Sequence, residues 1–193
     1  MYYEFENLRV AGIRYADLRG YSYDRSDVSA RGLANAYAQT LGTVFTQEPK
    51  PYEIELCVAE VGLTPERDQI YRLTYDGSVA DQHGFVVMGG ASGAAEERLK
   101  AGWREGMPLA DALIVAVAAL AADPAGGEPR TLAPDQLEVA VLDRNRPRRT
   151  FRRIVGPLLA DLLNADSPTA HAPEVDEGIP GHHDTLSGEA PPN

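Results

Sequence analysis

Cysteine, lysine and histidine are all scarce in this 193-residue sequence. The single cysteine, Cys57, excludes an internal disulfide and suits a reducing compartment. The N-terminus, MYYEFENLRV, lacks the basic start and apolar stretch of a signal peptide. The longest apolar stretch, near 109–122, is interrupted by Asp111 and is too short to cross a bilayer. We therefore expect a cytoplasmic protein that is not associated with a membrane.

The charge is unevenly distributed along the chain. The net charge is −11, and hydrophobic and charged residues make up 44% and 24% of the sequence, as in ordinary globular proteins. No lysine or arginine follows Arg153, whereas 166–193 contains six acidic residues. We predict one folded domain over 1–165, followed by a disordered acidic tail over 166–193.

The first part of the chain has the apolar spacing of two helices. In the first helix, near 4–21, Leu8 follows Phe5 at helical spacing, and Gly20 is expected to end or bend the helix. The second helix, near 29–46, has a stronger pattern. Its N-cap is expected at Ser29 or Asp27. Its predicted core residues are Leu33, Tyr37, Leu41, Val44 and Phe45.

Extended segments follow the two helices. Alternating apolar residues predict strands over 54–61 and 70–75, and the apolar run 85–89 predicts a third. The pair Asp76-Gly77 predicts a hairpin turn after the second strand. Their connections are too short for crossover helices, so we expect antiparallel pairing.

The remaining elements are two helices, two strands and a short helix. The helices are predicted over 92–105 and 108–122, and the strands over 137–143 and 149–154. A single helix beyond 149 also fits the apolar spacing, but Pro157 would break it. We favour a helix beginning at Pro157, giving the order ααβββααββα and an α+β fold of antiparallel sheets between helix pairs.

The segment FVVMGGASG, 85–93, and an arginine-rich segment raise the possibility of phosphate or nucleic-acid binding. The glycine turn lacks the lysine of a Walker motif and follows a meander, so a permissive corner at Gly89 and Gly90 is favoured. The overall acidity argues against nucleic-acid binding and favours a solvated or protein-contacting face for the arginines. These are Arg144, Arg146, Arg148, Arg149, Arg152 and Arg153.

The residue types give little indication of catalysis. His83 is the only histidine outside the tail and lies in a turn, where a surface role is favoured. Cys57 is expected to be a core residue of its strand. The tail histidines could bind metal only adventitiously, since no cysteine or carboxylate cage accompanies them. These are His171, His182 and His183.

Five segments closely resemble actinobacterial proteasome α subunits, of the proteasome-type threonine peptidase family. They are NLRVAGIRYADLRGYSYDRSDV (7–28), LANAYAQTLGTVFTQEPKPYEIELCVAEVG (33–62), IYRLTYDGSVAD (70–81), FVVMGG (85–90) and LEVAVLDRNRPRRTFRRI (137–154). The resemblance implies a proteasome-type, Ntn-hydrolase-like αββα sandwich of four layers. It also implies that the N-terminal helix and first strands of the family are missing here, through a misplaced gene start, a fragment or a short form.

The resemblance also implies a role. The chain would be a non-catalytic subunit of a threonine-type endopeptidase complex, with no catalytic, cofactor-binding or metal-binding residues of its own. It would form a homo-heptameric outer ring that scaffolds the β rings, gates substrate entry and docks a ring ATPase. The helices near 4–21 and 29–46 would face the β ring.

Two alternatives from other functional classes are an oligomeric adaptor that uses the acidic tail, and a small-molecule enzyme that uses Asp76, His83 and the glycine corner.

Overall fold

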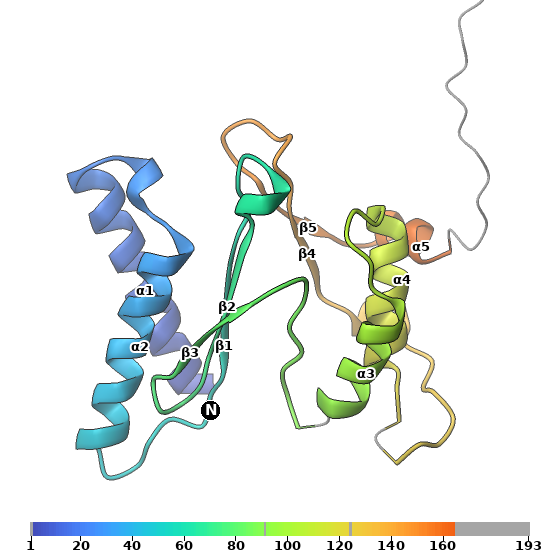
Figure 1. Ribbon diagram of the computed structural model, residues 1–193, viewed down its shortest axis with the longest axis horizontal. Helices are drawn as coiled ribbons and strands as arrows, with labels where there is room; N and C mark the ends of the chain where they lie inside the picture. Colours follow the sequence, from blue (N-terminus) through green and yellow to red (C-terminus); the bar gives the residue numbers. More distant parts are fainter. Residues whose placement is uncertain (1, 91, 124, 165–193) are drawn as a thin grey trace, which may run out of the picture.

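The protein forms four layers, in the order helices, sheet, sheet, helices (Figure 1). The computed structural model describes residues 2–90, 92–123 and 125–164. The predicted acidic tail over 166–193 therefore lies outside the described residues. The helices are α1 (Tyr2–Ser22), α2 (Ala30–Gln47), α3 (Ser92–Gly102), α4 (Leu109–Leu120) and α5 (Pro157–Leu163). The strands are β1 (Leu56–Glu60), β2 (Gln69–Leu73), β3 (Val79–Gln82), β4 (Val139–Leu142) and β5 (Phe151–Ile154).

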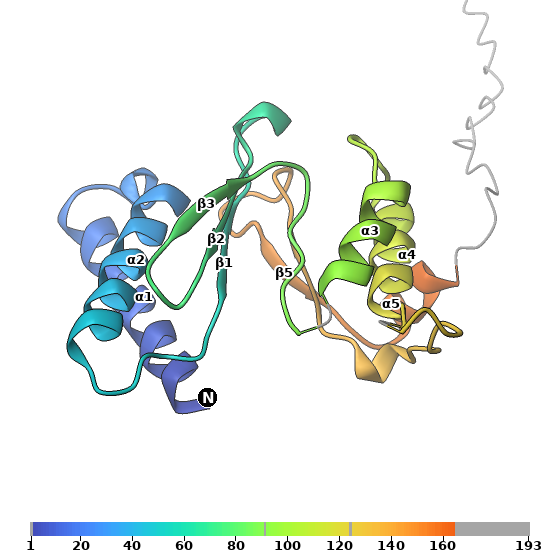
Figure 2. The same cartoon turned by 60° about the horizontal axis from the view of Figure 1, so that its bottom comes forward.

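Both sheets are antiparallel, as predicted. Strands β1, β2 and β3 form one sheet in sequence order, with Val58 opposite Tyr71 in the first pair. Strands β4 and β5 form the second sheet, with Val139 opposite Ile154. Helices α1 and α2 lie on one side of the two sheets, and α3, α4 and α5 lie on the other (Figures 1 and 2). This arrangement confirms the α+β class.

The main core lies between α1, α2 and the first sheet. Leu8 of α1, Leu41 of α2 and Leu73 of β2 are each at most 1% exposed. Alternation along β1 directs Leu56 and Val58 toward this core, as the sequence pattern predicted. Burial of a leucine side chain contributes about 1.5–3 kcal/mol before entropy is considered, so these residues anchor the helix pair on the sheet.

Two predicted helix starts are confirmed at the level of single atoms. The Ser29 hydroxyl accepts a hydrogen bond from the backbone N–H of Gly32 at 3.1 Å, so Ser29 is the N-cap of α2. Helix α5 begins at Pro157, after Gly156 with a φ of 62°. A left-handed residue followed by proline separates β5 from α5, which explains why one continuous helix does not form.

Three predicted details are wrong. The third strand is Val79–Gln82 instead of 85–89, because the Asp76-Gly77 turn returns the chain directly onto β2. Within the described residues, 85–89 pairs with no strand. The first helix, expected near 4–21, is Tyr2–Ser22, so it does not end at Gly20. Phe45 is 44% exposed and contacts the Tyr75 ring, so it is not a core residue.

Candidate assembly surface

The turn that follows β2 holds the carboxylate of Asp76. This carboxylate accepts hydrogen bonds from the Thr74 hydroxyl and from the backbone N–H and hydroxyl of Ser78. The Thr74 hydroxyl, followed by the Ser78 donors, holds the pKa of Asp76 below its ordinary value. Because these donors come from its own turn, Asp76 fixes the hairpin geometry.

The other two residues considered for catalysis, His83 and Cys57, belong to different structural elements from Asp76. His83 is exposed in the turn after β3, where its carbonyl accepts a hydrogen bond from the N–H of Phe85 at 3.0 Å. Cys57 is also exposed, which corrects its predicted core position. Leu56 and Val58 occupy the helix-covered face of β1, so alternation directs the Cys57 thiol to the opposite face.

The glycine corner has a backbone role at one of its two glycines. Gly89 has a φ of 118°, a region that favours glycine, and its carbonyl accepts a hydrogen bond from the Ser92 N–H at 3.3 Å. Gly90 is not among the described residues with positive φ. Gly89 thus turns the chain into α3.

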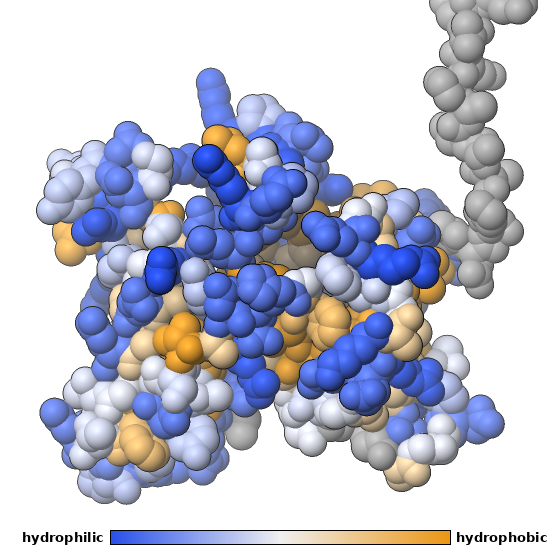
Figure 3. All heavy atoms as spheres, in the orientation of Figure 1, coloured by the Kyte–Doolittle hydropathy of each residue, from blue (hydrophilic) through white to orange (hydrophobic). Residues whose placement is uncertain are grey.

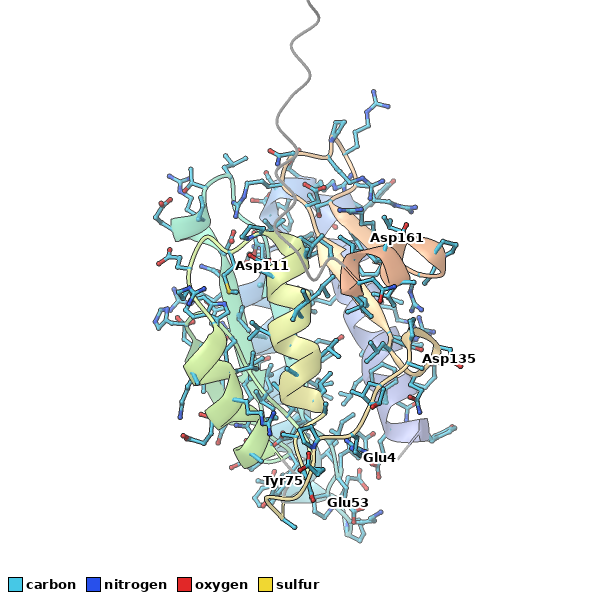
Figure 4. The ribbon with its side chains drawn as sticks, turned by 90° about the vertical axis from the view of Figure 1, so that its right-hand side faces the viewer. Glu4, Glu53, Tyr75, Asp111, Asp135 and Asp161 are labelled. Atoms are coloured by element: carbon cyan, nitrogen blue, oxygen red, sulfur yellow. The ribbon has the colours of Figure 1, made fainter. Side chains whose placement is uncertain are left out.

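Acidic residues are dispersed over the structure. Figure 4 shows Asp111, Asp135 and Asp161 on separate elements around α4, η3 (Pro134–Gln136) and α5. Within the part of the chain that the structure describes, no group of three His, Cys, Asp or Glu residues could hold a metal ion. His171, His182 and His183 lie outside the described residues.

A polar network joins the loop between β1 and β2 to the hairpin between β4 and β5. Arg144 donates to the Gly62 carbonyl at 2.8 Å and to the Asp68 carboxylate at 2.7 Å. The other Asp68 carboxylate oxygen accepts from the Gly62 N–H at 2.8 Å. Sequence reasoning missed this clamp, because 76 residues separate Asp68 from Arg144. These three residues, Gly62, Asp68 and Arg144, are here called the clamp, which links the β1–β2 loop of the first sheet to the β4–β5 hairpin of the second.

A cavity of about 690 Å³ lies beside the clamp. His83, Trp103 and Met107 contribute to its walls together with the clamp residues. On the face of the molecule drawn in Figure 3, apolar side chains lie in the central part, between the α1–α2 side and the α3–α4 side. Since Arg144 is paired with Asp68, its charge is already balanced within the wall of this cavity.

Helix α1 packs closely on α2 through a small residue. A Cβ atom at Gly12 would collide with the Tyr37 hydroxyl, so a side chain at this position would displace the tyrosine ring. Tyr37 is half-buried, and this burial raises the pKa of its phenol. Leu8, one turn earlier, completes the inner face of α1.

The opposite side of α1 carries large apolar side chains in solvent. At 100° per residue Tyr3, Ile13 and Tyr21 point well away from Leu8, and Leu18 lies on the flank of the helix; these four residues, here called the outer face of α1, are 78%, 46%, 93% and 69% exposed. The charged residues Glu6, Arg14 and Asp17 alternate with them along the helix. Exposed apolar residues surrounded by charges are typical of protein interfaces. The outer face of α1 is therefore a candidate assembly surface.

Comparisons with known proteins show the family to which the chain belongs. The sequence profile of the proteasome subunit family matches residues 7–142. The protein named proteasome subunit alpha of Kineococcus radiotolerans is 69% identical over 166 residues, which cover 84% of this chain and 70% of the relative.

Two further relatives carry the same name. The proteasome subunit alpha of Sanguibacter keddieii is 59% identical over 188 residues, which cover 97% of this chain and 73% of the relative. That of Geodermatophilus obscurus is 54% identical over 218 aligned positions, which cover 98% of this chain and 76% of the relative. With a family match over more than half of its length and relatives of this similarity, the chain belongs to the proteasome subunit family.

Proposed function

We propose that this chain is a non-catalytic α subunit of a proteasome core particle, in which it forms part of the outer ring and contacts β subunits. The observation that supports this proposal is the exposed apolar outer face of α1 on a fold of the proteasome family. Relatives that are 54–69% identical are named proteasome subunit alpha.

The non-catalytic part of the proposal is supported by how the candidate residues are used. Asp76 is bound within its own turn, and Cys57 is exposed on a face of strand β1. Nucleophilic catalysis requires a nucleophile and a base within hydrogen-bond reach. Peptide-bond cleavage would accordingly belong to the β partners.

The finer parts of the role follow from the family resemblance. They are a ring of seven copies, gating of substrate entry and docking of a ring ATPase, in the cytoplasm. No helix within the described residues is long and apolar enough to cross a membrane. Substrates would be polypeptides that enter the chamber through the ring.

A charge-insertion experiment tests the assembly role. Leu18→Glu together with Tyr21→Glu places two charges on the outer face of α1, and Leu120→Glu on α4 is the matched control, since Leu120 is 53% exposed. Each variant is co-expressed with tagged β subunits, and the captured complex is sized by chromatography and native mass spectrometry. We expect the α1 variant to lose capture by the β subunits, and the α4 variant to retain it.

Exposed substitutions usually change stability by at most about 0.5 kcal/mol, so urea unfolding should give similar free energies for both variants and the native sequence. Undiminished capture of the α1 variant would contradict the proposed contact surface. Peptide hydrolysis by the chain free of β subunits would contradict the non-catalytic role.

A further inference from the structure

The segment from Arg144 to Arg153, here called the arginine hairpin, connects β4 to β5 and enters β5. It contains six arginines and no acidic residue. It forms the orange loop at the upper end of the second sheet in Figure 1. Four of its guanidinium groups, those of Arg146, Arg148, Arg149 and Arg153, are on exposed residues. This is a concentrated positive surface on a chain whose net charge is −11.

The other two arginines are partly neutralised by carboxylates. Arg144 pairs with Asp68 at 2.7 Å, and Arg152 lies 3.8 Å from the Asp143 carboxylate. The exposed four have no carboxylate partner among the described ion pairs. The only recorded side-chain bond among them is from Arg146 to the Phe151 carbonyl at 3.2 Å, which leaves its charge unbalanced.

Backbone contacts hold the arginine hairpin in place. Arg148 has a φ of 69°, uncommon for a residue with a side chain, and its carbonyl accepts a hydrogen bond from Arg25 at 2.7 Å. Asp24 and Asp27, on either side of Arg25, are the nearest acids in sequence to this contact. Both carboxylates already cap the short helix η1 (Arg25–Asp27). They leave the exposed guanidinium groups free for another anion.

Lysines elsewhere on the surface already have local partners. Lys50 pairs with Glu4 and Glu53, each at 3.7 Å, and Lys100 pairs with Glu96 at 2.9 Å and Glu97 at 3.6 Å. Exposed arginines elsewhere, such as Arg14, Arg98 and Arg130, stand singly in the sequence, so the arginine hairpin differs from the rest of the surface in its local concentration of cations.

The sequence supplies a segment of complementary charge. Residues 166–193 carry six carboxylates and no lysine or arginine. An acidic polypeptide is attracted most strongly by the arginine hairpin, because positive charge is more concentrated there than anywhere else along this acidic chain. Nucleic acid would gain the same local contacts, but its many phosphates would face repulsion from the rest of the protein.

The tail is long enough to reach the arginine hairpin whatever path it takes. Arg149 and Asn164 are 15 residues apart in sequence, so they lie within about 54 Å of each other. The 29 residues that follow Asn164 span up to about 100 Å when extended. Tethering of this kind gives an effective concentration in the millimolar range, which makes weak charge pairing sufficient.

We propose that the acidic segment 166–193 docks on the arginine hairpin of the same chain and shields it from other acidic partners. Arginine and carboxylate groups would form multiple charge-assisted hydrogen bonds across this contact. This inference does not depend on assembly with β subunits.

Zero-length crosslinking of the full-length chain tests the docking. Arg149→Lys keeps the positive charge and introduces an amine, which a carbodiimide can join to a tail carboxylate as an amide. Arg130→Lys, at another exposed arginine, is the matched control, and Lys50 and Lys100 are internal controls. Mass spectrometry quantifies links between each lysine and 166–193.

We expect at least about fivefold more tail links at Lys-substituted position 149 than at position 130. We expect this excess to disappear in about 0.5 M salt, where charges separated by more than a few ångströms are screened. Arg146→Gln with Arg148→Gln and Arg153→Gln, added to the Arg149→Lys chain, should also remove it. Equal yields at positions 149 and 130, or an excess that salt does not change, would overturn the proposal.

Two other occupants are distinguishable. In a mixture of isotopically labelled and unlabelled chains, links that join two different copies would show that a neighbour's tail docks, which would overturn the intrachain assignment. Binding of a single-stranded DNA oligonucleotide by the full-length chain at about 0.15 M salt, lost with the three Arg→Gln substitutions, would indicate nucleic acid and would also overturn it.

Discussion

The turn between β2 and β3 docks on α2 so closely that one added methyl group should destabilise the protein. Gly77 has a φ of 86°, and a Cβ atom there would lie 2.7 Å from the Ala38 carbonyl oxygen and 2.9 Å from the Gly42 nitrogen. Both contacts are to helix backbone, which cannot rotate away as a side chain can. Gly77→Ala would therefore combine left-handed strain with displacement of α2 from the turn.

The structure contains a control that separates these two effects. Gly106 has a φ of 77°, and a Cβ atom there would meet nothing within 4 Å. Left-handed strain costs about 1–2 kcal/mol for an alanine, and overpacking adds about 1–3 kcal/mol. Gly→Ala also lowers the entropy of the unfolded chain, which offsets about 0.4–1 kcal/mol in both variants.

The difference between the two variants isolates the steric contact, because strain and unfolded-state entropy nearly cancel. We expect Gly77→Ala to lower the free energy of unfolding by about 1–3 kcal/mol more than Gly106→Ala. Urea unfolding followed by far-ultraviolet circular dichroism measures both values. Equal losses at the two positions would refute the argument that Gly77 is required for docking on α2.

The remaining predictions concern the clamp and the turn carboxylate. Arg144→Gln should lower the free energy of unfolding by about 1–3 kcal/mol, because it removes charge-assisted bonds to Asp68 and Gly62. In the same urea assay, the control Arg98→Gln, at an exposed arginine, should change it by at most about 0.5 kcal/mol. Equal effects of the two substitutions would contradict a stabilising role of the clamp. For Asp76 the folded pKa is depressed, so its stabilisation is present above the unfolded pKa of about 3.9 and is lost as the pH falls through the lower folded pKa. As the pH is lowered below about 4, the free energy of unfolding should therefore fall less for Asp76→Asn than for the native chain. Identical pH profiles of the two proteins would contradict the stabilising role of the Asp76 carboxylate.

Local sequence signals predicted much of the fold. Some signals act within a few residues of their own position, so their effects can be predicted from the sequence. They are the N-cap at Ser29, the turn at Asp76-Gly77 and the helix break at Gly156-Pro157. The third strand depended on which segment paired with β2. The Asp76-Gly77 turn places Val79–Gln82 opposite β2. Residues 85–89 have the apolar composition of a strand but pair with no strand among the described residues.

The surface was less predictable than the fold. An apolar residue in a periodic pattern was taken as core, but Phe45 is 44% exposed, and Cys57 is exposed on the face of its strand that points away from α1 and α2. The Arg144 clamp joins residues far apart in sequence, and no short motif specifies it. The prediction that α1 and α2 face another subunit came from the family resemblance and not from the local pattern.

The distribution of large apolar side chains supports assembly on energetic grounds. Within the described residues, seven large hydrophobic residues from valine upward in size are buried, and sixteen are exposed. Burial contributes about 25 cal/mol per Å² of apolar surface, so the apolar side chains that remain in solvent do not contribute this stabilisation to the isolated chain. A partner that covers the outer face of α1 would add its binding free energy to the stability of the folded chain. The exposed positions on α1 are thus better explained by the needs of a multisubunit particle than by those of an isolated fold.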